Sequence, residues 1–169
     1  MSSQPNPLRN ILAPTVFANT ALAGLNLSLS LFVIPRLLES PTPLMLRQFS
    51  HMLKGAGPFV PLPTLFCALS YWYMAYAVRH LPSKSRLLAA AGACCFTIVP
   101  WTGFFMTSIN KKLFKKVEET KDMGIMAVGL SQEEEEGAKS LVDQWGLYNL
   151  GRGLAIGIGG AVGLYTVGL

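Results

Sequence analysis

The hydrophobic residues of this chain gather into four long stretches that hold almost no charge. Three stretches are free of Asp, Glu, Lys and Arg altogether, and they begin after Arg9, Lys54 and Arg86. The fourth follows Asp143 and is interrupted only by Arg152. Each stretch can hold a helix of about 20 residues, the length that crosses roughly 30 Å of hydrocarbon. The pattern predicts four membrane-spanning helices, at residues 11–34, 58–78, 87–110 and 145–168.

The apolar stretches are continuous rather than alternating, which favours helices over the strands of a membrane barrel. Hydrophobic residues make up 51% of the 169 residues and charged residues 14%, and the mean hydropathy is +0.40, which is too apolar for a soluble domain of this size. The first stretch is longer than the apolar core of a signal peptide and lacks a clear cleavage pattern, so we expect it to be retained. We predict an all-α protein, an integral membrane four-helix bundle in which residues 1–169 form a single domain.

Two connecting segments carry helical patterns of their own. Residues 44–54 are amphipathic and end at Gly55, so we expect a short helix at the membrane interface. In the connection 111–144, Ser131 is followed three residues later by Glu134, which is a capping box at the start of a helix. The prediction is one helix that runs unbroken from Gln132 through the fourth span.

Lysine and arginine are distributed unequally between the two ends of the predicted bundle. The end that holds both termini has four of them, Arg9, Arg79, Lys84 and Arg86, whereas most of the others belong to loops one and three. This excess predicts that loops one and three are cytoplasmic. The basic residues flank apolar segments instead of forming a stripe with aromatic residues. The expected partner of the net charge of +5 is therefore the lipid bilayer and not nucleic acid.

Polar side chains are aligned on two of the predicted helices. Trp145, Asn149 and Arg152 are spaced i, i+4 and i+7 and share one face of the fourth span. A second stripe lies at the end of the third span, where Thr102, Met106 and Asn110 are spaced i, i+4 and i+8. Both stripes end at the same side of the membrane, so we expect them to meet. A guanidinium in hydrocarbon costs at least a few kcal/mol, so Arg152 either lines a cavity or reaches back to the headgroups.

Further polar groups lie on the first span and on the first loop. Asn19, Asn26 and Ser30 share a face that we expect to point into the bundle, where hydrogen bonds to neighbouring helices are the simplest role. His51 lies on the amphipathic segment, at the same end as Arg152. Histidine is the residue type whose unperturbed pKa suits proton transfer near neutrality, and the alternative for His51 is an interfacial residue without chemistry.

Three motifs are HMLKGAGPFVPLP at residues 51–63, PWTGFFMTSINKKL at 100–113 and WGLYNLGRG at 145–153. Together they resemble the small integral-membrane anthrone oxygenases. The resemblance implies a membrane-bound oxygenase that oxidises a small aromatic polyketide, an anthrone or a similar polycyclic phenol, to a quinone with molecular oxygen. It also implies a role in secondary metabolism, and we expect the endoplasmic reticulum or another endomembrane as the location.

Such a reaction needs a base beside the acidic methylene, donors for the developing oxyanion and apolar walls. On the matching residues, His51 is the predicted base, and Arg152 with Asn110 and Asn149 are the predicted oxyanion donors. The substrate would lie against five further side chains, Trp101, Thr102, Met106, Trp145 and Tyr148. No cofactor is expected besides molecular oxygen as co-substrate.

Several alternatives remain open at this level. A haem- or metal-dependent membrane oxidoreductase is one, and a haem would have His51 as its single axial ligand. With only two histidines, the chain cannot supply a site of many imidazoles, and the three cysteines lie inside spans, where they serve packing. Another alternative is a non-enzymatic tetraspan, an assembly or transport partner whose arginine pairs with lipid phosphate or with another subunit. A homo-oligomer is compatible with either function.

Overall fold

Helix is the only regular structure in the part of the chain that the computed structural model describes, residues 7–57, 59–124 and 130–167. The first helix runs without interruption from Pro7 to Leu38. It comprises α1 (Pro7–Ser28), the π-helical turn η1 (Leu29–Val33) and α2 (Ile34–Leu38). Asn19 and Asn26 are fully buried, which confirms the inward face that their spacing predicts.

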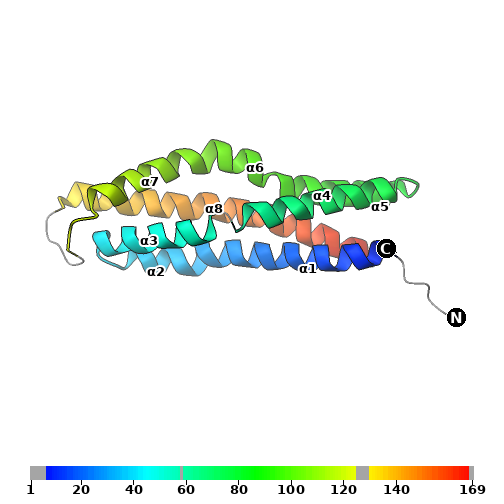
Figure 1. Ribbon diagram of the computed structural model, residues 1–169, viewed down its shortest axis with the longest axis horizontal. Coiled ribbons are helices and arrows are strands. Elements are labelled where there is room, and N and C mark those ends of the chain that lie inside the picture. The colour runs from blue at the N-terminus through cyan, green and yellow to red at the C-terminus, as the bar shows by residue number, and fades with distance from the viewer. Residues whose placement is uncertain (1–6, 58, 125–129, 168–169) are drawn as a thin grey trace.

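The second helical column consists of two helices in tandem. α3 (Thr42–Ala56) runs back beside the first helix, and α4 (Pro61–Ala77) continues in the same direction after a short break (Figure 1). α3 corresponds to the amphipathic segment that the sequence predicts at 44–54. Met45, Leu46 and Phe49 are buried on its inner face. Pro61 begins α4, in the position where a missing N–H costs nothing.

The third column is one long path with two irregular points. It comprises α5 (Pro82–Phe96), α6 (Ile98–Trp101), the π-helical turn η2 (Thr102–Met106) and α7 (Thr107–Glu119). Pro100 has no N–H to bond to the carbonyl of Phe96, which accounts for the interruption at Thr97 between α5 and α6. The helix passes the predicted end at residue 110, because the following lysines and glutamates favour helix.

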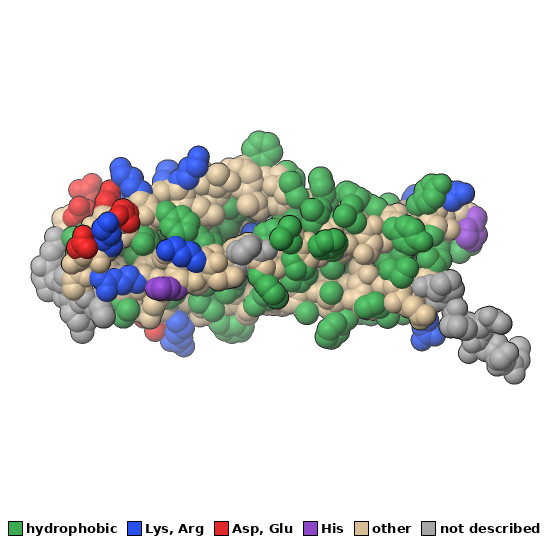
Figure 2. All heavy atoms as spheres, viewed as in Figure 1, with side chains coloured by type: hydrophobic (Ala, Val, Ile, Leu, Met, Phe, Trp, Pro, Cys, Tyr) green, Lys and Arg blue, Asp and Glu red, His purple; other side chains and the backbone are tan. Residues whose placement is uncertain are grey.

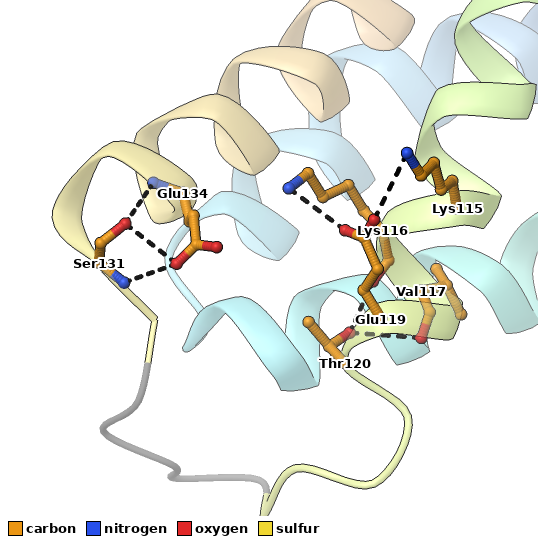
Figure 3. A network of polar contacts seen from close by, with 7 residues as sticks. All are labelled: Lys115, Lys116, Val117, Glu119, Thr120, Ser131 and Glu134. Atoms are coloured by element: carbon orange, nitrogen blue, oxygen red, sulfur yellow. Dashed lines mark hydrogen bonds and ion pairs between the residues drawn. The ribbon is translucent and has the colours of Figure 1, made fainter.

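The fourth column is the single helix α8 (Gln132–Val167), which confirms an unbroken helix from Gln132 through the fourth span. Figure 3 shows its capping box: the Ser131 backbone N–H donates to a Glu134 carboxylate oxygen at 2.9 Å, and the Glu134 N–H donates back to the Ser131 hydroxyl at 3.3 Å. These bonds from Ser131 lower the pKa of Glu134 below its ordinary value. On the neighbouring end of α7, Lys116 pairs with Glu119 at 3.3 Å.

The sequence predicts a bundle of four spanning helices with a short interfacial helix beside it, whereas the described residues form a bundle of five helices. The fifth is α3, which has 15 residues and packs into the core instead of lying only at the interface. The four-column arrangement survives because α3 and α4 share one column (Figure 1). The helices pack around two large clusters of buried side chains, and a small third cluster consists of Ala23, Val60, Ile98 and Ile156. One large cluster joins α1, α4 and α5, the other joins α2, α3 and α7, and α8 runs along both.

The surface differs between the two halves of this elongated bundle. Large apolar side chains stand exposed over α1, α4 and the second half of α8; Phe17, Phe66 and Leu164 are 77%, 69% and 61% exposed. On the face drawn in Figure 2, acidic side chains gather only toward the left-hand end. Among the described residues, three helices, 8–38, 82–119 and 132–167, are long and apolar enough to cross a membrane, whereas the sequence predicts four. The predicted span 58–78 corresponds to α4, which has 17 residues and is not one of the three.

Glycines bring α8 close to its neighbours. A Cβ at Gly159 would lie 3.0 Å from the Ala91 carbonyl oxygen and 3.1 Å from the Cys94 Cβ atom, so this turn packs directly on α5. A Cβ at Gly163 would clash with the Tyr71 ring of α4. Gly159 and Gly163 are four residues apart, a spacing of small residues that is typical of close helix packing in membranes, and both serve packing here.

Candidate functional site

A small cavity lies where α3 gives way to α4, beside the middle of α8. Its volume is about 70 Å³. It is lined by Leu29, Met52, Leu53, Gly57, Val60, Pro61, Thr102, Met106, Asn110, Trp145 and Arg152. The two π-helical turns reach the same level, since η1 contributes Leu29 and η2 contributes Thr102 and Met106. A π turn widens a helix locally and is frequent at functional sites.

Arg152 is buried in this cavity wall, with 8% of the residue exposed. Its Nη2 atom donates two hydrogen bonds, to Asn26 Oδ1 at 2.9 Å and to Asn149 Oδ1 at 2.6 Å. Asn149 is held in turn, because its Nδ2 atom donates to the Asn26 carbonyl oxygen at 2.9 Å and to the Ser30 hydroxyl at 2.8 Å. The guanidinium thus points inward and is fixed by α1, η1 and α8.

The positive charge of Arg152 has no acidic partner among the described residues. Its ligands are amide oxygens, and its Nε atom is buried without any hydrogen bond. Leaving a buried donor of a charged group unpaired costs more than the 1–3 kcal/mol typical of neutral groups. The site therefore contains an unneutralised cation whose Nε and Nη1 atoms form no hydrogen bond with the described residues.

The second stripe supplies polar groups on the other side of the cavity. Trp145 Nε1 donates to Asn110 Oδ1 at 3.0 Å, which leaves the Asn110 amide nitrogen free of hydrogen bonds within the described chain. Thr102 Oγ1 is buried without a partner. Phe49 packs edge-on against the Trp145 ring, with centroids 5.2 Å apart. Three groups with unused hydrogen-bonding capacity, on Arg152, Thr102 and Asn110, therefore border one small volume.

Two of the five side chains that were predicted to contact substrate do not line this cavity. Trp101 and Tyr148 lie on another side of α8: Trp101 Nε1 donates to the Tyr148 carbonyl oxygen at 3.0 Å, and Phe105 contacts both rings. Neither residue lines the cavity at Arg152. Helical spacing explains the position of Trp101, because it lies one residue, or about 100° around the helix, from the cavity-lining Thr102.

His51 also lies outside the cavity. Its side chain is exposed on α3, whereas the following residues Met52 and Leu53 line the cavity. The reason is helical geometry: Phe49 faces inward, and two residues later the helix has turned by about 200°. The expectation that its imidazole lies beside Arg152 is not met by this geometry. Its role as base stays a prediction.

Two residues of the site were not predicted as part of it. Asn26 supplies an acceptor to Arg152 and Ser30 an acceptor to Asn149. The sequence signal was present, because both belong to the inward polar face of the first span. Their association with Arg152 could not be derived from the sequence. Asn26 and Arg152 are 126 residues apart in the chain, and their contact depends on how the two helices pack.

Fold and site together define a class: an all-α bundle with helices long enough to cross a membrane and one buried cation facing a small cavity. A family model described as anthrone oxygenase matches residues 49–162, and the chain belongs to this family. The chain is also 30% identical, over 89% of its length and 79% of the relative's, to a protein named monooxygenase hypC from Dothistroma septosporum. No solved structure matches.

Membership of this family makes the chain an oxygenase of the monooxygenase class. The alternative of a non-enzymatic assembly or transport partner is thereby set aside. The matched segment includes every residue that lines the cavity except Leu29. Asn26 and Ser30 lie before it.

Proposed function

We propose that this protein is a membrane-bound oxygenase that converts an anthrone, or a similar polycyclic phenol, to a quinone with molecular oxygen, in the cavity at Arg152. One observation carries the proposal: a buried guanidinium without an acidic partner faces a cavity that is otherwise mostly apolar. A flat aromatic anion matches both properties, because its rings suit the apolar walls and its oxyanion suits the cation.

The membrane placement is supported by helix length and surface. α8 has 36 residues and is about 54 Å long, well beyond the roughly 30 Å of a hydrocarbon core. We propose that the half built from α1, α4, α5 and the end of α8 is embedded in an endomembrane such as the endoplasmic reticulum. The half with α3, α7 and the capping box then stands in the cytoplasm, and Arg152 lies near the boundary.

A boundary position suits an apolar substrate that dissolves in the membrane. The cavity of about 70 Å³ is smaller than the roughly 300–1,000 Å³ of ordinary ligand sites, so substrate must widen it. Met52 and Met106 are the lining side chains that can yield, since the unbranched thioether side chain of methionine has several accessible rotamers. The break between α3 and α4 gives one wall freedom to move.

The chemistry requires no external reductant. Loss of a proton from the anthrone methylene gives a delocalised anion, which passes one electron to dioxygen. The resulting carbon radical and superoxide combine into a peroxide, and this loses water to leave the quinone carbonyl. One oxygen atom enters the product and the other leaves as water, and the substrate supplies all the electrons.

In this scheme Arg152 stabilises the anion rather than removing the proton. An arginine side chain does not act as a base near neutrality, but a cation within a few ångströms lowers the pKa of an acidic substrate. Thr102 and Asn110 would donate to the same developing oxyanion. His51 is the remaining candidate base, and it would have to act from the exposed face of α3.

The proposal includes no resident cofactor. Among the described residues, no group of three or more His, Cys, Asp or Glu side chains is arranged to hold a metal ion. A haem bound through His51 would sit on the exposed side of α3, away from Arg152. Metal analysis and the visible spectrum of active protein distinguish these cases.

The test compares the unaltered protein with the variants Arg152→Gln, Arg36→Gln and His51→Gln, each purified in detergent, with a hydroxylated anthrone as substrate. Quinone formation and oxygen uptake are measured against the spontaneous reaction. Arg152→Gln should lower kcat/KM by about 10²–10³-fold. Arg36→Gln, which removes only an exposed ion pair with Glu39, is the matched control and should leave the rate unchanged. If the unaltered protein forms quinone no faster than the spontaneous reaction does, the proposal is wrong.

His51→Gln in the same assay separates two mechanisms. A loss comparable to that of Arg152→Gln would assign the proton transfer to His51. A nearly unchanged rate would mean that the proton leaves to water while Arg152 holds the anion.

A further inference from the structure

A second cavity lies at the far end of the bundle, where α1 begins and α4 turns into α5. Its volume is about 230 Å³, larger than the cavity at Arg152. The floor is apolar and includes Leu12, Met74 and Leu88. The remaining wall carries Arg9, His80 and Lys84.

These three polar side chains have no partner in the described part of the chain. Other basic residues at this end are engaged: Arg79 lies 4.5 Å above the Tyr76 ring, and Arg86 Nε donates to the Pro82 carbonyl oxygen at 3.2 Å. Arg9, His80 and Lys84 form no hydrogen bond or ion pair with described residues.

No acidic side chain can neutralise this cavity from nearby in the sequence. All nine Asp and Glu residues lie between Glu39 and Asp143, in the segments that build the opposite half. Figure 2 shows blue and purple side chains at the right-hand end and red ones only toward the left. The cavity therefore combines an apolar floor with an unbalanced positive wall.

This combination matches an amphiphile with a negative headgroup. The cavity also lies at the end of the apolar half, at the level where headgroups would meet the protein in a bilayer. Basic pockets between membrane helices are known to bind anionic lipid headgroups. We propose that this cavity binds an anionic phospholipid, with its phosphate between Arg9 and Lys84 and an acyl chain along the apolar floor.

Native mass spectrometry of the intact protein in detergent tests the proposal. Phosphatidylglycerol and phosphatidylcholine with identical acyl chains are added in equal amounts. The unaltered protein should retain phosphatidylglycerol in preference. Each basic residue at a lipid surface contributes about fivefold, so the double variant Arg9→Gln/Lys84→Gln should weaken the preference by about 25-fold.

The matched control is Arg79→Gln/Arg86→Gln, which removes the same charge at the same end from groups that already have partners. It should keep most of the preference. Equal binding of both lipids, or equal losses in the two double variants, would overturn the proposal. Full displacement by millimolar inorganic phosphate would also overturn it, because it would indicate a site for free phosphate.

If the double variant does not give monodisperse protein in detergent, Lys84→Gln alone provides the test, with an expected loss of about fivefold. No loss in this single variant contradicts the proposal. The readout is lipid retention and not catalysis, so its outcome is independent of the oxygenase reaction at Arg152.

Discussion

Arg152 is held by amide oxygens where most buried arginines have a carboxylate. Asn26 and Asn149 accept its hydrogen bonds but do not cancel its charge. An acidic residue in their place would neutralise the guanidinium before substrate arrives. The asparagines therefore position the cation and preserve its attraction for an anion, which is the arrangement that favours a developing oxyanion.

Asn26→Asp tests this distinction between positioning and neutralisation. The substitution keeps the side-chain shape and gives Arg152 an ion-pair partner at the present 2.9 Å contact. We expect kcat/KM for anthrone oxidation to fall by at least about tenfold, because the substrate anion then competes with a fixed carboxylate. Asn26→Leu is the comparison, and it should lower the melting temperature more than Asn26→Asp does. An Asp variant as active as the unaltered protein would contradict the role of an unneutralised cation.

The sequence predicted most of the polar groups around Arg152 but not the hydrogen bonds that join them to the first helix. The alignment of Trp145, Asn149 and Arg152 on one face follows from helical spacing, and so does the stripe that ends at Asn110. The position of His51 could have been derived from the same spacing, since it lies opposite Phe49 on α3. The bonds from Arg152 to α1 depend on how helices pack, which spacing alone does not specify.

At the scale of elements, the cavity exists because three columns are irregular at one level. η1 and η2 each widen a helix, and the break between α3 and α4 removes part of a third wall. Helix positions were predictable from the charge-free stretches. The π turns were not, because an added residue per turn leaves no mark in composition. The length of α3 was also missed, since an amphipathic segment predicts a helix but not whether it packs as a column.

Close packing of α8 on α5 predicts different results at two neighbouring glycines. A Cβ at Gly159 would lie 3.0 Å from the Ala91 carbonyl oxygen, whereas a Cβ at Gly157 would meet only the Ala23 Cβ atom at 3.8 Å. Gly159→Ala should therefore lower the melting temperature. Gly157→Ala should leave it unchanged or raise it, because alanine favours helix. Thermal unfolding in one detergent measures both, and equal effects would refute the close approach of α5 and α8.

The capping box of α8 predicts a pH dependence. Hydrogen bonds from Ser131 lower the pKa of Glu134 in the folded state, so the ionised carboxylate stabilises the fold. This stabilisation is present above the unfolded pKa and is lost as the pH falls through the lowered, folded pKa. Ser131→Ala should lower the melting temperature at neutral pH by roughly 2–4 °C, and the difference should shrink in acid. A difference that grows in acid would contradict this sign.

The whole molecule is longer than a membrane is thick, and its surface changes along its length. Most of the exposed large apolar side chains lie on one half and around the two π turns, and the acidic residues are confined to the other half. Composition predicted the apolar half and the all-α class. It did not predict that the other half would be an ordered extension of the bundle, because α3 and α7 look like loops when only membrane spans are counted.

Spin labels on α8 test where the membrane lies. In a variant whose three cysteines are alanine, labels are attached at Leu164→Cys and at Glu136→Cys, two exposed positions. In lipid nanodiscs, the label at 164 should be relaxed by oxygen, which concentrates in hydrocarbon, and the label at 136 by a water-soluble nickel chelate. Equal access of the nickel chelate to both positions would place the whole of α8 in water.

The central claim is that Arg152 binds a substrate anion, and a spectrophotometric titration of a bound phenol measures this directly. A hydroxylated anthraquinone changes colour when its phenol ionises, so its apparent pKa can be followed while it is bound to the protein. The phenol should ionise at a pH at least about one unit lower on the unaltered protein than on Arg152→Gln, because a nearby cation favours the phenolate. Identical ionisation on the two proteins would show that Arg152 does not face the ligand, and the proposed site would be wrong.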